Sequence, residues 1–176
     1  MNPRQSFEAR IAPHLDAAFN LARWLLRSDP QAEDAVQEAA IRALRYLGSL
    51  RGGDAKPWFL GIVRNTCFTL LERTQGGPDW VEFDEQVFHG LIGPGGTQRG
   101  NPEDLLEQGQ TKQRVDAALR ALSPPLREAI VLREFEDLDY AAMAQIMGVP
   151  IGTVMSRLSR AREKLRAALA TDRQGG

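Results

Sequence analysis

Apolar residues recur at steps of three and four positions over most of the chain, which is the spacing of one face of an α-helix. Alternating patterns typical of strands are scarce. The first helical stripe consists of Leu15, Ala18, Phe19, Ala22, Leu25 and Leu26. Asp29 is the expected cap of a second helix, with Pro30 at its first position. Its expected inner face consists of Val36, Ala39 or Ala40, Ala43, Leu44 and Leu47.

A third helix is predicted from about Lys56 to Arg73, entered by Pro57. Gly61 lies inside it and costs about 1 kcal/mol relative to alanine, so this helix should depend on tertiary packing. The helical pattern then stops in a stretch rich in glycine and proline. We therefore expect an all-α protein of two small helical bundles, residues 1–75 and 109–176, joined by a flexible linker over residues 76–108.

The second bundle ends in the pattern of a helix-turn-helix. Asp139 should start a short helix, and Pro150 precedes the last one. Ala144, Gly148 and Val154 have the spacing this motif needs: a small residue where the helices approach, a glycine in the turn, and an apolar residue that packs inward.

Charge is strongly segregated behind a formal net charge of −1. Residues 76–110 hold one basic and seven acidic residues, whereas residues 151–176 hold six basic and two acidic ones. The C-terminal stretch therefore suits a polyanion such as nucleic acid, and the acidic linker would repel it.

The other composition data exclude several classes of protein. The chain has 176 residues with one cysteine, Cys67, and two histidines, which rules out an internal disulfide and makes a zinc site remote. No apolar run approaches the ~18 residues of a membrane span and no leader pattern opens the chain, so a cytoplasmic protein without a cofactor is expected.

The last helix should present hydroxyl and basic side chains outward, opposite an apolar stripe. Short hydroxyls beside arginines are suited to touching phosphates and base edges in a major groove. The alternative is a solvated amphipathic helix, which the helix-turn-helix spacing disfavours. The expected outward set consists of Thr153, Ser156, Arg157, Ser159, Arg160 and Lys164.

Two separate motif sets resemble the extracytoplasmic-function sigma factors of the sigma-70 family, which direct bacterial RNA polymerase to promoters. The C-terminal set runs from Asp137 to Arg166 and resembles the domain that binds the promoter −35 element as duplex. The N-terminal set consists of Ala32–Glu38 with Arg42-Ala43-Leu44, and of Pro57-Trp58-Phe59 with Arg64-Asn65. It resembles the domain that grips core polymerase and captures the melted −10 element.

The resemblance implies three groups of site residues. Asp34, Gln37 and Glu38 would contact the clamp helices of the largest polymerase subunit, although the bare pattern is equally that of ordinary surface side chains. The −10 group would be Leu50, Arg51, Trp58, Arg64 and Asn65, with Trp58 also fitting a place in the core. The −35 group would be Arg133 and Tyr140 together with the outward set of the last helix. Met155 departs from the family pattern, which often has a basic residue there.

The resemblance also implies partners: core RNA polymerase, including its flap for the C-terminal domain, promoter DNA, and an anti-sigma factor. The linker segment Trp80–Leu91 could join the anti-sigma interface, and the linker's acids suit a basic polymerase channel. One alternative is a free-standing helix-turn-helix repressor or activator, which leaves the Asp34–Glu38 face without a purpose. The other is an enzyme, for which no catalytic set or phosphate-binding loop is found.

Overall fold

The computed structural model describes residues 2–75 and 109–174, and within these ranges every regular element is helical, as the sequence predicts. The N-terminal part contains α1 (Pro3–Arg10), η1 (Ala12–His14), α2 (Leu15–Leu26), α3 (Asp29–Tyr46), η2 (Leu47–Ser49) and α4 (Ala55–Gln75). The C-terminal part contains α7 (Gly109–Ala121), α8 (Pro124–Ile130), the π-helical turn η3 (Val131–Phe135), α9 (Tyr140–Met147) and α10 (Ile151–Gln174). The predicted linker, including Trp80–Leu91, lies outside the described residues.

Local chemistry explains where the N-terminal helices begin and end. Arg27 takes a left-handed conformation, with φ 58°, that ends α2. Ser28, and not Asp29, is the N-cap of α3, and its Oγ accepts a hydrogen bond from the Gln31 amide at 3.4 Å. The predicted cap was one residue off because Ser28 is extended, as a cap must be, whereas Asp29 already lies within the helix.

Helices α2, α3 and α4 pack against one another and form the N-terminal bundle. Leu21, Leu25, Phe59 and Leu60 are buried at its centre. Cys67 is also buried, and burial together with the charge of Glu128 raises the pKa of its thiol to about 12. This cysteine is therefore a core residue with very little thiolate at neutral pH.

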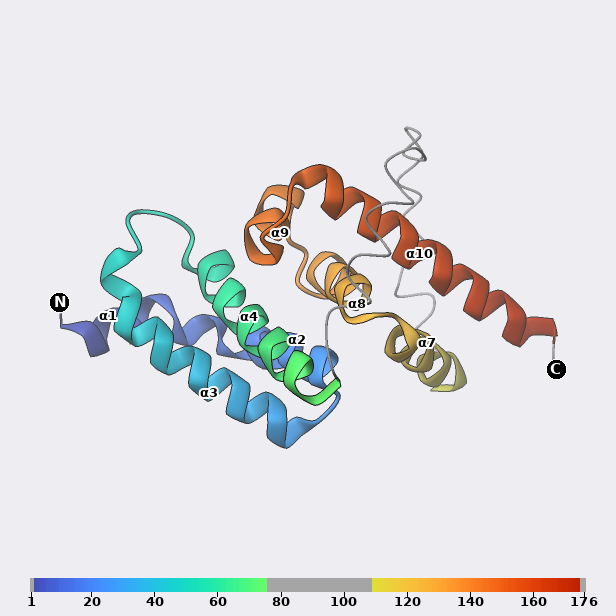
Figure 1. The fold of residues 1–176 in the computed structure, drawn as a ribbon, viewed down its shortest axis with the longest axis horizontal. Coiled ribbons are helices and arrows are strands. Elements are labelled where there is room, and N and C mark those ends of the chain that lie inside the picture. The colour runs from blue at the N-terminus through green and yellow to red at the C-terminus, as the bar shows by residue number, and fades with distance from the viewer. Residues whose placement is uncertain (1, 76–108, 175–176) are drawn as a thin grey trace.

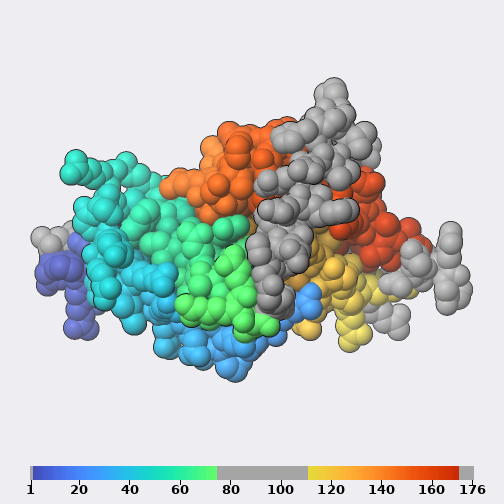
Figure 2. Space-filling model, viewed as in Figure 1, coloured from blue at the N-terminus to red at the C-terminus, as the bar shows by residue number. Residues whose placement is uncertain are grey.

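The two bundles pack directly on each other (Figure 1), with α4 against α9 and α2 against α8. One continuous cluster of buried apolar residues runs through both bundles. The space-filling view shows the same junction where the green α4 meets the orange C-terminal residues (Figure 2). We call this contact between α2 and α4 on one side and α8, η3 and α9 on the other the junction.

No helix within residues 2–75 and 109–174 combines the length and the apolarity that crossing a membrane requires.

Candidate nucleic-acid and protein interfaces

Helices α9 and α10 form a helix-turn-helix, as predicted. Asp139 caps α9, and its carboxylate accepts a hydrogen bond from the Ala142 amide at 2.8 Å. Gly148 ends α9 with φ 67°, and its amide donates to the Ala144 carbonyl at 2.9 Å. Because a side chain at this φ would be strained, glycine sets the tight turn. Val154 is fully buried and holds α10 onto the rest of the bundle.

The structure places most of the predicted outward residues of α10 at its surface. Ser159 and Lys164 are exposed, while Thr153, Ser156 and Arg160 are partly exposed. Arg157 is a correction, because only 5% of it is exposed. It lies on the buried side of α10, beside Val154 and Leu158, and its charge acts on Glu128.

Arg133 and Tyr140, both predicted to meet the −35 element, lie beside each other where α9 begins. The Arg133 guanidinium lies 5.3 Å from the centre of the Tyr140 ring, and its Nη1 donates to the Leu138 carbonyl at 2.7 Å. These contacts orient both side chains within the helix-turn-helix domain.

The polar face of α3 is open. Asp34, Gln37 and Glu38 are all exposed, and Glu38 accepts a hydrogen bond from Arg42 at 2.9 Å. Leu44 is a correction, because it was predicted to face inward and is 44% exposed. Ile41, three positions earlier on the same side of α3, is 61% exposed. Sequence periodicity missed this exposure because leucine at helical spacing usually means core.

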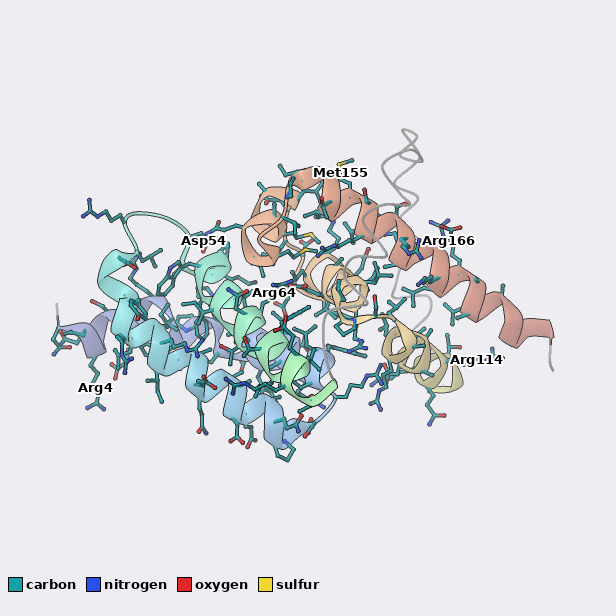
Figure 3. All side chains as sticks on the ribbon, in the orientation of Figure 1. Arg4, Asp54, Arg64, Arg114, Met155 and Arg166 are labelled. Atoms are coloured by element: carbon teal, nitrogen blue, oxygen red, sulfur yellow. The ribbon has the colours of Figure 1, made fainter. Side chains whose placement is uncertain are left out.

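The predicted −10 residues are divided between surface and junction. Arg51 and Asn65 are exposed, and Leu50 and Trp58 are partly buried and pack against the core. Arg64 points from α4 into the junction (Figure 3), where its Nε donates to Glu128 Oε1 at 2.7 Å. A second bond joins its Nη2 to Oε2 at 3.4 Å, and the guanidinium also covers the Phe68 ring at 4.0 Å.

Glu128 is the charged centre of the junction. It is fully buried on α8, and apart from Arg64 it lies in the field of Arg157. Burial raises the pKa of its carboxyl, while the two guanidiniums oppose the rise. The sequence did not reveal Glu128 as a junction residue, because its partner lies 64 positions away.

Arg127 is a second junction residue that the sequence did not reveal. Its guanidinium donates to the Trp24 carbonyl at 2.8 Å and the Leu25 carbonyl at 3.3 Å, at the end of α2. It also reaches three carbonyls between Leu119 and Leu122. Burial, with the charges of Arg27 and Arg120, lowers the pKa of Arg127 to about 10. One arginine therefore caps helix ends in both bundles.

Gly61 lies where α4 faces α9. A Cβ at Gly61 would lie 3.8 Å from the backbone of Ile146, an ordinary contact, so a methyl group fits between the helices. At the rim, Glu136 accepts a hydrogen bond from Asn20 at 3.2 Å, its carboxylate lies 3.6 Å from Lys56 Nζ, and Trp24 stacks on Phe135 at 5.7 Å. No cluster of metal-ligating side chains occurs in the parts of the chain that the structure describes.

Comparison with known proteins matches both bundles to the same family. The family model described as Sigma-70 region 2 matches residues 11–76, and that described as Sigma-70, region 4 matches residues 112–165. The RNA polymerase sigma-H factor of Pseudomonas aeruginosa is 32% identical over 170 residues, which are 94% of this chain and 87% of the relative. The ECF RNA polymerase sigma-E factor of Escherichia coli is 37% identical over 134 residues, 75% of this chain and 70% of the relative.

Two solved structures share the fold. The sigma factor RpoE from Bartonella quintana, in complex with the anti-sigma factor NepR, is 31% identical with a TM-score of 0.67. The match covers 94% of this chain and 98% of that one. CnrH in complex with the cytosolic domain of CnrY is 23% identical, with a TM-score of 0.64 over 96% of this chain and 90% of that one.

Proposed function

The chain belongs to the extracytoplasmic-function (ECF) branch of the sigma-70 family, and from that premise we propose how its surfaces divide the work of promoter-specific initiation. It binds core RNA polymerase and directs it to promoters. The polar face of α3, with Asp34, Gln37 and Glu38, binds the clamp helices of the largest polymerase subunit. The C-terminal bundle binds the polymerase flap. Helix α10 docks on −35 duplex, while α4 and the loop before it capture melted −10 bases.

The observation that carries this proposal is the presence of both surfaces, the open acidic face of α3 and a complete helix-turn-helix, on one chain. As a sigma factor the chain acts without a chemical step of its own, and the polymerase does the chemistry. It needs no cofactor in this role. Since polymerase and chromosome are cytoplasmic in bacteria, we place the chain there.

The test is co-elution of the purified chain with bacterial core RNA polymerase, followed by run-off transcription from a promoter library. We expect the double variant Asp34→Ala, Glu38→Ala to lose at least tenfold in affinity for core, because both carboxylates are exposed on one face of α3. The matched control is Asp16→Asn, an exposed acid on α2 that should leave core binding unchanged.

A chain that binds duplex tightly by itself and ignores core polymerase would be the free-standing repressor, and the sigma assignment of these surfaces would be wrong. Equal affinity for core polymerase in the double variant and the wild type would remove the α3 face from the polymerase interface. The proposed DNA-binding surfaces would be unaffected by that result.

We also infer that the arrangement in Figure 1 is the inhibited one. Positions −10 and −35 of a promoter are separated by roughly 85 Å at 3.4 Å per base pair. Helix α10 has 24 residues and is about 36 Å long at 1.5 Å per residue, and it belongs to a bundle packed directly on α4. Bundles in contact therefore cannot occupy both elements at once, and promoter binding requires the junction to open.

The contacts of Arg64 support this inference. In the packed arrangement the residue proposed for the −10 element is occupied by Glu128 of the other bundle. The sigma factor RpoE shares this fold over nearly its whole length and is in complex with the anti-sigma factor NepR. An anti-sigma factor that stabilises the packed bundles would keep this chain from promoters.

A further inference from the structure

The outer surface of the first turns of α10 is more apolar than its sequence suggests. Ile151 is 46% exposed and Met155 is 39% exposed. Residues four apart lie next to each other on a helix, so the two side chains form one apolar patch at the start of α10. Figure 3 shows Met155 at the outer edge of the molecule, directed away from the junction.

Two of the polar residues expected to read bases from these turns are engaged elsewhere, and a third, Thr153, is only partly exposed. Ser156 Oγ donates to the Gly152 carbonyl of its own helix at 2.9 Å, and Arg157 is buried. Gly152 itself has no side chain and borders open space. Ile151 and Met155 are therefore the large side chains that this part of α10 offers to a partner.

Duplex DNA presents one apolar group in its major groove, the 5-methyl group of thymine. The N-terminal residues of a recognition helix are those that approach base edges. Burial of a methyl group against exposed apolar side chains removes both from water and is favourable. The unbranched thioether of methionine also adapts its shape to such a contact.

We propose that Ile151 and Met155 select thymine in the −35 element by packing on its 5-methyl groups, an inference that rests on the proposed binding of duplex by α10. Ser159 and Lys164, exposed one and more turns further along, remain available to the sugar–phosphate backbone. Four residues of helix rise about 6 Å, so the selected thymines lie within about two base pairs of each other.

The experiment uses the full chain bound to core RNA polymerase. Promoters with a randomised −35 element are first selected by binding, and we expect thymine at two nearby positions. Each thymine is then replaced by deoxyuridine, which lacks only the methyl group. Loss of one buried methyl contact should weaken binding about fourfold. Met155→Ala and Ile151→Ala should each abolish this sensitivity at one position.

The matched control is Glu163→Gln, an exposed residue two turns further along α10 that should keep the full response to deoxyuridine. Met155→Arg should shift the preference at its position from thymine toward guanine, which presents two acceptors to a guanidinium. Selected elements without thymine, or equal binding of thymine and deoxyuridine promoters, would overturn the inference while leaving the sigma function intact. Failure to bind any promoter would instead overturn the proposed function and, with it, this inference.

Discussion

Helices α4 and α10 both carry residues proposed to touch promoter DNA, yet the structure presents them in opposite states. On α10 the side chains of Met155, Ser159 and Lys164 are exposed to solvent. On α4, by contrast, Gly61 faces the backbone of Ile146 in α9, and Arg64 is paired with the buried carboxylate of Glu128. The −35 surface is therefore accessible in the packed form, whereas part of the −10 surface becomes accessible only when the bundles separate.

In the proposed function, this difference makes opening of the junction the step that controls promoter binding. A ligand can shift an equilibrium only through different affinities for its two states. We therefore expect core polymerase with promoter to favour the separated bundles, and a partner that spans both bundles to favour the packed ones. The three predictions below weaken the junction or test the open surface, in order of decreasing effect.

The largest effect is expected from Glu128→Ala. The substitution leaves Arg64 in the junction with 17% of its side chain exposed and without its carboxylate partner. Breaking a buried pair from one side costs about 3–5 kcal/mol, so the bundles should separate. The increase in radius of gyration can be measured by small-angle X-ray scattering on the purified chain. The affinity for melted −10 DNA should also increase.

Two controls isolate the pair. The double variant Arg64→Met, Glu128→Leu should restore the packed form, because an apolar pair of similar volume often replaces a buried ion pair without loss. Glu134→Gln should change the scattering very little, because its partner Arg162 lies in the same bundle and both side chains are about one-third exposed. A packed Glu128→Ala variant would show that apolar contacts alone hold the junction.

Gly61 offers a smaller and graded perturbation of the same contact. In Gly61→Ala the new Cβ meets the Ile146 backbone at 3.8 Å, an ordinary contact, and the helix gains about 1 kcal/mol. Gly61→Leu has no such room and should cost about 1–3 kcal/mol by overpacking. The midpoint temperature of thermal unfolding should therefore rise in Gly61→Ala and fall in Gly61→Leu.

The leucine variant should also scatter as a more extended particle than the alanine variant. If both variants unfold and scatter alike, α4 and α9 do not meet at Gly61 in solution. The comparison between the covered and the open helix would then lose its basis.

The smallest effect concerns the open surface of α10. Lys164→Ala removes one exposed cation, so the slope of log affinity against log salt for promoter duplex should fall by about one. Titrations of the holoenzyme at several salt concentrations measure this slope. Arg173 lies beyond the residues expected to reach the duplex, so Arg173→Ala is a suitable comparison of equal charge. An unchanged slope in Lys164→Ala would remove this residue from the phosphate contacts.

The helix-turn-helix was predictable because its determinants are local. Asp139 and Gly148 act on backbone groups within a few positions, and Val154 is an apolar residue at an inward position of its helix, as the motif predicts. The helical character of both bundles was predictable for the same reason. Arg157 and Leu44 were placed on the wrong side because helical spacing gives the relative positions of side chains and not the partner that covers each face.

The order of helices, the turn and cap chemistry, and the acidic face of α3 follow from the sequence by itself, since each depends on short spacing and residue type. The junction was decided only by tertiary structure. Arg64 with Glu128, Arg127 with α2, and Gly61 with Ile146 each join residues at least 64 positions apart. Such contacts have no local signature in the sequence. The same charged residues occur in buried ion pairs and on the surface, and only the fold determines which partner each one meets.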